Sequence, residues 1–292
     1  MDFIIPVPEA FNFSHCVSYL RRSPKELLHV FEGDTLIKVI RASGHSVLFS
    51  VRYLTGEGIR VDMITPRKTA LVSAVEKYVR EWFDLDTDLR PFFEMASKDK
   101  LLKPLAAQYY GYRIVGLPDL FESLVWAVIG QQINLGFAHT LKQRFVEHFG
   151  ERLTIRGATY YLFPEPGVIA QLHPEDLLTL QFSRQKSRYI IGLARAFASG
   201  EISREKLQAM EPGERMETLL SIKGIGSWTA NYVLMRTFRY PEAFPLGDAG
   251  LNTALRRLLK LDRKPTSAEV QRIFQRYRGW EAYATLYFWK SL

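Results

Sequence analysis

The sequence has little cysteine and no long apolar run free of charge. Cys16 is the only cysteine in 292 residues, so the chain can form no internal disulfide and cannot hold an iron–sulfur cluster on cysteine thiolates. A single thiol is compatible with a reducing cytoplasm, which is the expected location. The N-terminus lacks the basic start and apolar run of a signal peptide, and no stretch is long enough to span a bilayer, so no membrane partner is expected. The six histidines are scattered, which argues against a zinc site.

Hydrophobic and basic residues are plentiful. Hydrophobic residues make up 47% of the chain, which is enough for a sizeable core and argues against disorder. The formal net charge of +8 favours a polyanionic partner, either nucleic acid or an anionic membrane surface, although many other proteins are basic. Arg184, Lys186 and Arg188 follow Ser183 at an expected helix start, where they could face phosphate or simply form a solvated helix face.

The first 90 residues and the rest of the chain have different patterns. β-branched and aromatic runs at 35–40, 47–53 and 59–64 are separated by glycine-containing turns and predict antiparallel strands. Helices are expected to begin at Ser23-Pro24 and to cover 70–83. From about residue 90 helical periodicity dominates and strand signals nearly vanish. The expected helices there are 91–109, 120–129, 135–149, 165–172, 174–180, 184–199, 203–209, 211–220, 228–237, 249–259, 267–277 and 280–289. The fold class is therefore α+β, with an antiparallel-sheet domain at 1–90 and an all-α core at 91–292.

The most informative segment runs from residue 217 to residue 232. A helix is expected to end near Leu220, and Lys223-Gly224-Ile225-Gly226 forms a tight turn before a new helix opens near Ser227. Glycines at such a turn allow a ligand to approach the backbone, and the helix start favours phosphate. Ile225 would anchor the turn in the core. A bare Gly-x-Gly could equally be an ordinary helix–helix corner, but the segment fits a helix-hairpin-helix element that holds one DNA strand by its backbone.

Asp248 lies directly before another expected helix, in the segment Phe244-Pro-Leu-Gly-Asp-Ala-Gly-Leu251. Taken alone it reads as a plain helix N-cap, which is the commonest use of an aspartate in this position. Because it follows the hairpin in the sequence, Asp248 is also a candidate catalytic residue.

These segments together resemble the helix-hairpin-helix DNA glycosylase superfamily, and within it the DNA-3-methyladenine glycosylase II (AlkA) type. The similar segments are Lys223 to Tyr232, with lysine in place of the usual proline, Phe244 to Asp248, Gly111 to Gly116, Asp119 to Gln132, and Gly279 to Trp289. The resemblance is strong over residues 105–292. It implies a TATA-box-binding-protein-like N-terminal domain, to which Phe11 to His15 also fits, and a core of two lobes at 115–230 and at 231–292 plus 91–114.

The resemblance implies a mechanism and assigns residues to it. Asp248 matches the catalytic carboxylate, which stabilises positive charge on the sugar while the N-glycosidic bond breaks. Trp228, Tyr232 and Trp289 match the aromatic pocket, with Tyr19 as a further ring and Gln131 as a lining residue; for Tyr19 a plain core role is at least as good a reading. Gln132 is chosen as the wedge that fills the gap left by the flipped base, although both glutamines could be ordinary helix-end residues. The residues expected at the DNA backbone are Lys223, Gly224, Gly226, Ser227 and Thr229.

Two further properties follow from the same resemblance. Bifunctional relatives carry a Schiff-base lysine where Trp228 stands, so a monofunctional enzyme is expected that leaves an abasic site. The hairpin of this family holds Na⁺ or K⁺ on main-chain carbonyls, here those of Leu220, Ile222 and Ile225, and no cofactor is required for catalysis. The expected partner is double-stranded DNA with a damaged base, and a monomer is expected.

The leading hypothesis is a monofunctional glycosylase for alkylated purines such as 3-methyladenine and 7-methylguanine. Electron-rich rings attract the cationic bases that alkylation creates. A glycosylase for deaminated or oxidised bases, such as hypoxanthine or 8-oxoguanine, is the second reading. A DNA-binding module without activity is the third, and the carboxylate of Asp248 argues against it.

Overall fold

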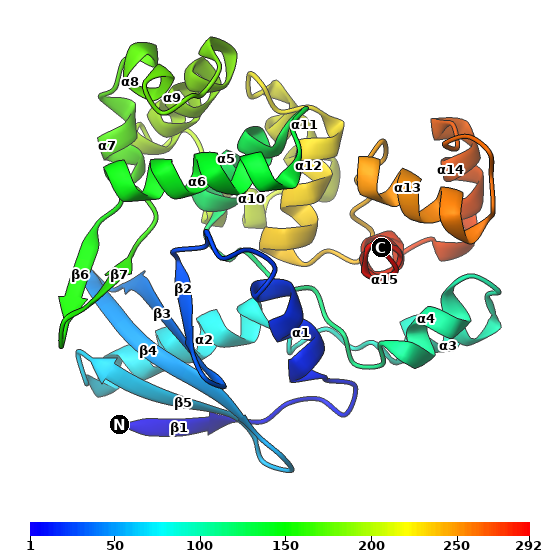
Figure 1. Cartoon of the computed structure of the whole chain (residues 1–292), viewed down its shortest axis with the longest axis horizontal. Helices are drawn as coiled ribbons and strands as arrows, with labels where there is room; N and C mark the ends of the chain where they lie inside the picture. Colours follow the sequence, from blue (N-terminus) through cyan, green and yellow to red (C-terminus); the bar gives the residue numbers. More distant parts are fainter. The chain divides into compact units, whose positions relative to one another are not determined.

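The computed structural model describes residues 1–292, and Figure 1 shows their helices and strands. The chain divides into two compact units. The first unit comprises Met1–Val7, Arg21–Arg80 and Asp119–Ala209, and the second comprises Pro8–Leu20, Glu81–Pro118 and Met210–Leu292. These units describe packing, and the domain boundary predicted near residue 90 stays a prediction. No helix has the length and apolar character needed to cross a membrane.

The first unit is built on a five-stranded antiparallel sheet of order β1-β5-β4-β3-β2. Its strands are β1 (Asp2–Ile5), β2 (His29–Glu32), β3 (Thr35–Ala42), β4 (His45–Leu54) and β5 (Gly58–Thr65). Neighbouring residues of β4 point to opposite faces, because side chains alternate along a strand. The Phe49 ring lies 6.2 Å from the Tyr78 ring of α2 (Val72–Trp82), while Leu48 packs with Tyr160 and Leu162 from a second hairpin.

That second hairpin, β6 (Arg152–Ile155) and β7 (Ala158–Tyr161), was not expected from the sequence. It lies in the part of the chain that was predicted to be an all-α core, so that prediction is wrong for residues 152–161. Its two-residue turn, Arg156-Gly157, has both φ angles positive, at 51° and 82°. This is the turn geometry that matches the twist of a hairpin.

The remaining elements of the first unit are helices. They are α5 (Leu120–Gly130), α6 (Leu135–Phe149), α7 (Pro166–Ala170), α8 (Pro174–Leu178), α9 (Arg184–Ala198) and α10 (Arg204–Ala209). Every residue of α5 from Leu120 to Ile129 is buried, and a helix that is buried all round serves as the centre of its lobe. The bounds of these helices lie within two residues of the predicted ones.

The second unit is entirely helical. It contains α1 (Phe13–Leu20), α3 (Arg90–Lys98), α4 (Leu102–Gln108), α11 (Pro212–Ser221), α12 (Ser227–Val233), α13 (Ala249–Leu258), α14 (Ser267–Phe274) and α15 (Glu281–Lys290). α15 is buried from Ala282 to Phe288. The hydroxyl of its Tyr287 donates to the carbonyls of Tyr109 and Tyr112 at 3.0 and 3.1 Å, which ties the loop after α4 to this central helix.

Several predicted elements differ in the structure. The helix expected at Ser23-Pro24 is a turn, while α1, β1 and β2 were missed. The single helix predicted over 91–109 is two helices, because the carboxylate of Asp99 accepts the N–H groups of Leu101 and Leu102 and starts a new helix there. The helix predicted over 228–237 ends as α12 and continues as a π-helical turn (Leu234–Phe238).

Candidate active site

The glycine turn between α11 and α12 has the predicted form. Gly224 has a φ of +94°, a conformation that favours glycine, and Ile225 is buried. Gly226 is the N-cap of α12 with no side chain to cap it, so the helix start is open to an outside acceptor. Lys223 is exposed, as are Gly226 and Ser227, whereas the side chain of Thr229 is buried. A DNA contact by Thr229 can therefore come only from its backbone.

Asp248 is the N-cap of α13, as predicted. Its Oδ1 accepts the backbone N–H of Leu251 at 2.7 Å. The residue before it, Gly247, has a φ of +87°, which turns the chain into the helix start. A backbone N–H therefore holds the carboxylate at the positive end of a helix.

Two tryptophan side chains converge on this carboxylate. Trp289 of α15 donates its indole N–H to Oδ1 of Asp248 at 2.7 Å, and Trp228 of α12 donates to Oδ2 at 3.1 Å. The structure thus brings together three residues that lie up to 61 positions apart in the sequence, all within the second unit. Oδ1 accepts two short hydrogen bonds and Oδ2 one longer one, so Oδ2 keeps the greater capacity for a further partner.

Aromatic rings line the same place. The Trp228 and Tyr232 rings are stacked, with their centroids 5.3 Å apart and their planes 22° apart. Tyr232 is buried, while Trp228, Trp289 and Tyr19 are partly exposed. Three of the predicted site residues, Trp228, Tyr232 and Trp289, therefore belong to one cluster with Asp248.

Arg236 is a member of this cluster that the sequence analysis missed. Its guanidinium carbon lies 4.5 Å from the Tyr19 ring centroid, 5.5 Å from that of Trp289 and 5.7 Å from that of Tyr232. The only signal in the sequence is a lone arginine within the apolar run Val233-Leu-Met-Arg-Thr-Phe238. A buried charge at such a position has to be explained by its surroundings.

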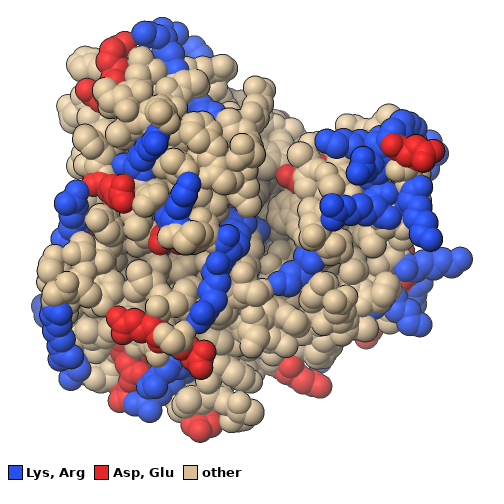
Figure 2. All heavy atoms as spheres, in the orientation of Figure 1, with Lys and Arg blue, Asp and Glu red and all other residues tan.

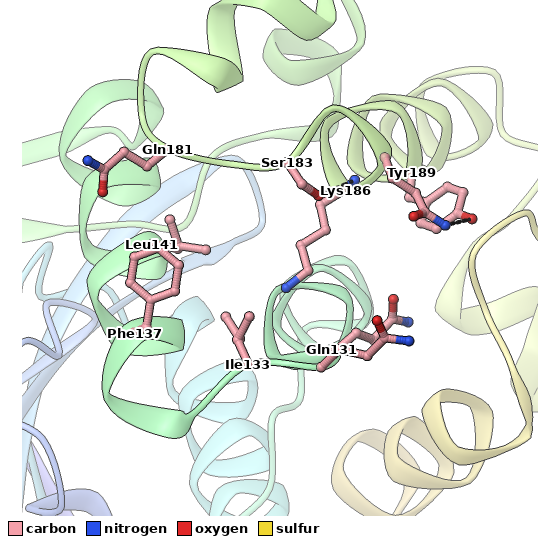
Figure 3. A pocket seen from close by; sticks show the side chains of 10 residues that line it. Gln131, Ile133, Phe137, Leu141, Gln181, Ser183, Lys186 and Tyr189 are labelled. Atoms are coloured by element: carbon pink, nitrogen blue, oxygen red, sulfur yellow. Dashed lines mark hydrogen bonds between the residues drawn. The ribbon is translucent and has the colours of Figure 1, made fainter.

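The predicted glutamines lie in the first unit, at the end of α5. Gln131 is the C-cap residue of α5, and Gln132 follows with a φ of +56° and an exposed side chain. Both line a pocket of about 250 Å³, together with Ile133, Phe137, Leu141, Gln181, Ser183, Gln185, Lys186 and Tyr189 (Figure 3). The roles of wedge and lining residue stay predictions.

Lys186 extends from α9 toward the end of α5 in this pocket (Figure 3). Its ammonium donates to the carbonyl of Ile129 at 2.6 Å, and burial lowers the pKa of Lys186. Arg184 is exposed and pairs with Glu175 at 2.9 Å, and Arg188 is exposed. Of the predicted basic cluster, Lys186 thus helps to hold the end of α5, while Arg184 and Arg188 face solvent.

Basic side chains also gather over α13 and α14 (Figure 2). The exposed ones on and between these helices are Arg256, Arg257, Lys260, Arg263, Lys264 and Arg272. Only Glu269 opposes them closely, through two 2.8 Å contacts to Arg263. Part of this positive charge, on Arg256 and Arg257, therefore belongs to α13, the helix whose N-terminus carries Asp248.

Comparisons with known proteins bear on the whole chain. Residues 125–278 match the family model described as HhH-GPD superfamily base excision DNA repair protein, and residues 15–124 match the 8-oxoguanine DNA glycosylase N-terminal domain. The chain is 44% identical to a DNA-3-methyladenine glycosylase of Bacillus subtilis (strain 168), covering 99% of this chain and 96% of that protein. It is 33% identical to DNA-3-methyladenine glycosylase 2 of Escherichia coli (strain K12), covering 63% of this chain and 62% of that protein.

Among solved structures, a 3-methyladenine DNA-glycosylase from Archaeoglobus fulgidus superposes with a TM-score of 0.84 at 24% identity, covering 99% of this chain and 97% of the other. At that identity the likeness concerns the fold alone. The predicted fold class, a sheet domain followed by a helical core, is confirmed.

Proposed function

Because this chain belongs to the HhH-GPD superfamily of base excision DNA repair proteins, we propose that it is a monofunctional DNA glycosylase for alkylated purines. It would flip a base of the 3-methyladenine or 7-methylguanine type out of duplex DNA and hydrolyse its N-glycosidic bond, leaving an abasic site. One observation carries this proposal: the carboxylate of Asp248 is held by two indole N–H groups beside stacked aromatic rings.

Asp248 would act on the sugar. Breaking the N-glycosidic bond builds positive charge at the sugar, and a fixed carboxylate stabilises that charge without having to reorganise. Oδ2 is the oxygen proposed to face the sugar, because Oδ1 is occupied by Leu251 and Trp289. The same oxygen would orient, or take a proton from, the attacking water.

The base would stack against the rings of Trp228, Tyr232 and Trp289. An alkylated purine leaves readily, so the pocket needs neither a general acid nor many specific hydrogen bonds. Trp228 stands where a nucleophilic lysine would be needed for strand cleavage, and an indole cannot form a Schiff base. This supports release of the base without cleavage of the strand.

Double-stranded DNA is the proposed partner, and the hairpin is proposed to be the main element that binds the DNA backbone. The uncapped start of α12 at Gly226 presents backbone N–H groups that suit a phosphate. Gln132 would fill the gap in the duplex and Gln131 would line the pocket. We expect a monomer, working in the cytoplasm where the chromosomal DNA lies.

The hairpin carbonyls fit a monovalent cation. Leu220 lies in the last turn of α11, where carbonyl groups lack partners within the helix, and the carbonyl of Ile222 accepts one hydrogen bond, from the N–H of Ile225. Together with the carbonyl of Ile225 these are neutral oxygen donors, which suit Na⁺ or K⁺. A bound ion would add positive charge next to the DNA backbone.

A panel of duplexes, each with one defined lesion, tests the proposed function. We expect alkali-labile abasic sites from 3-methyladenine and 7-methylguanine duplexes, free base in the supernatant, and no strand cleavage before alkali is added. Cleavage without alkali, or trapping of protein on DNA by borohydride, would show a bifunctional enzyme. Stable binding with no abasic sites on any lesion would identify a DNA-binding module.

Replacing Lys223 with alanine tests the anchoring role of the hairpin. Lys223 is exposed, and a lysine at a phosphate contributes about one unit to the slope of log affinity against log salt. We expect weaker binding to all duplexes alike, with the slope smaller by about 1. Titrations by fluorescence anisotropy at several salt concentrations measure it. Lys77→Ala, at an exposed lysine of α2, is the control. If the slope of log affinity against log salt decreased equally in both variants, Lys223 of the hairpin would have no specific role in binding the DNA backbone.

Replacing Gly250 with alanine tests how precisely the carboxylate of Asp248 must be positioned for base release. A Cβ at Gly250 would lie 3.1 Å from Oδ1 of Asp248 and 3.3 Å from Nε1 of Trp289, so these groups must shift by a few tenths of an ångström. We expect base release to slow by about tenfold, since small misplacements of reacting groups are costly. The melting temperature should not fall, because alanine favours a helix over glycine by up to about 1 kcal/mol.

Gly192→Ala is the matched control for that variant. Gly192 lies within α9, and a Cβ there meets nothing within 4 Å, so only the helix preference changes. Single-turnover base release and thermal melting of both variants separate the two effects. Full activity in Gly250→Ala would show that the position of Asp248 tolerates such a shift.

A further inference from the structure

Arg236 carries a buried positive charge within the proposed aromatic pocket. The residue is 2% exposed, and arginine stays protonated at any accessible pH. Its Nη1 donates to the carbonyl of Val115 at 2.9 Å, and its Nε has no hydrogen-bond partner. Its side chain also forms a hydrogen bond with the side chain of Tyr232, its other neighbours are aromatic rings, and no carboxylate is among its contacts. The rings of Tyr19, Tyr232 and Trp289, together with the Tyr232 hydroxyl, are therefore the main compensation for this charge.

The backbone fixes Arg236 in this place. The residue lies inside the π-helical turn Leu234–Phe238, and such turns are frequent at functional sites. Its carbonyl accepts the N–H of Leu117 at 2.8 Å, while its side chain reaches Val115. A Cβ at Gly116 would lie 2.5 Å from the carbonyl of Glu81 and 3.2 Å from that of Arg236. The loop thus packs directly on the backbone of Arg236, and the guanidinium has little freedom to leave.

This geometry changes the electrostatics of the pocket. The negative face of an aromatic ring attracts a cation, whether it belongs to the protein or to the ligand. A cation that is already present at Tyr232 and Trp289 draws ring electrons to itself and repels a second positive charge. Two of the three rings proposed to bind a cationic alkylated base, those of Tyr232 and Trp289, are therefore already engaged by a resident cation.

From this we infer that Arg236 is a specificity-determining residue, which weakens the preference of the pocket for positively charged bases and thereby keeps neutral damaged bases among its substrates. The inference rests on the proposed function, because it concerns the same pocket. It predicts a broad range of lesions rather than a strict preference for cationic ones.

The size of the effect follows from the distances. A base stacked on the far side of Trp289, whose ring centroid is 5.5 Å from the guanidinium carbon, would have its charge roughly 9 Å from that carbon. At the effective dielectric constants that apply to protein sites, the repulsion corresponds to about 5- to 20-fold in affinity. Neutral bases such as hypoxanthine do not experience this repulsion.

Substitution of Arg236 provides the main test. Single-turnover base release is measured against enzyme concentration for a 7-methylguanine duplex, which is cationic, and for a hypoxanthine duplex, which is neutral. In Arg236→Met we expect the half-saturating concentration for 7-methylguanine to fall relative to that for hypoxanthine by about 5- to 20-fold. In Arg236→Lys, which keeps the charge, the ratio should stay within about 2-fold of the wild type. A merely structural role would weaken both lesions equally in Arg236→Met, and that result would overturn the inference.

A second measurement uses the wild-type protein, so it does not require any substituted variant to fold. Duplexes carrying 2′-fluoro-7-methylguanosine, a slowly cleaved cation, and 7-methyl-7-deazaguanine, its neutral counterpart, are compared in binding. We expect affinities within about 3-fold of each other, because cation–π attraction is offset by Arg236. A preference of tenfold or more for the cation would overturn the inference. If the wild type releases no base from any duplex, the proposed function fails instead.

Discussion

Asp248→Asn is expected to lower the rate of base release by about 10³-fold, while binding to undamaged duplex DNA stays unchanged. The asparagine retains an oxygen that can cap α13 at the N–H of Leu251, so the helix start should survive. Its amide nitrogen, however, would replace Oδ2 and face the indole N–H of Trp228. The variant loses both the negative charge at the sugar and the acceptor for Trp228.

The measurement is single-turnover release of 7-methylguanine, with duplex affinity and thermal melting recorded for the same preparation. Asp119→Asn is the matched control, since Asp119 caps α5 by accepting the N–H of Glu122 at 2.9 Å and has no part in the aromatic cluster. The control should keep its activity. Retained activity in Asp248→Asn would refute the proposed mechanism, and loss of activity in both variants would point to a general effect on folding.

Of the single substitutions proposed for this protein, Lys142→Met is expected to lower the free energy of unfolding most. The Lys142 ammonium lies 3.1 Å from Glu26 and 3.1 Å from Glu122, and the side chains of all three are at most 12% exposed. Methionine has a similar volume but leaves two buried carboxylates without their cation. Removing one partner of such a network costs about 3–5 kcal/mol. Equilibrium unfolding in urea measures the loss.

Arg184→Met is the control, because it removes an ion pair whose side chains are more than half exposed and should change stability by less than about 1 kcal/mol. A small effect in Lys142→Met would show that the two carboxylates find other partners or take up protons. The double variant Glu26→Gln/Lys142→Met should recover part of the lost stability.

The same network predicts how stability depends on pH. Burial alone would raise the pKa of Glu26, but the Lys142 ammonium, His29 and the N–H of Leu28 outweigh burial and hold the pKa well below its ordinary value of 4.5. A carboxyl group with a depressed pKa in the folded state stabilises the protein above its unfolded pKa, and this contribution is lost as the pH falls below about 4.5. Unfolding curves at pH 7 and at lower pH should show a steeper loss in the wild type than in Glu26→Gln.

The sequence predicted those elements whose local signals are strong. The three long strands and most helices after residue 115 were found, because their residue periodicity and caps such as the Thr266–Glu269 capping box are local. The β6–β7 hairpin was missed because its four-residue strands are stabilised by packing on the sheet, through Tyr160 and Leu162, rather than by their own pattern. Contacts between distant segments override local preference in such short elements.

The candidate site was predicted in part for the same reason. Asp248 and the hairpin glycines stand in a motif, whereas the hydrogen bonds from Trp228 and Trp289 join three helices and cannot be read from spacing. The signal for Arg236 was too weak to identify it, because a lone arginine in an apolar run is equally compatible with an exposed position. Only the positions of Tyr19, Tyr232 and Trp289 around it explain how it is accommodated.

The division of the chain into two units limits how this protein can be recombined with its relatives. Each unit is made of three separate segments, so the chain passes five times from one unit to the other. Any single crossover between two genes leaves at least one unit assembled from both parents, and a crossover between the two outermost passages leaves both units mixed. Chimeras built by exchanging all three segments of one unit together should therefore retain more folded protein than chimeras with one crossover near the middle of the gene.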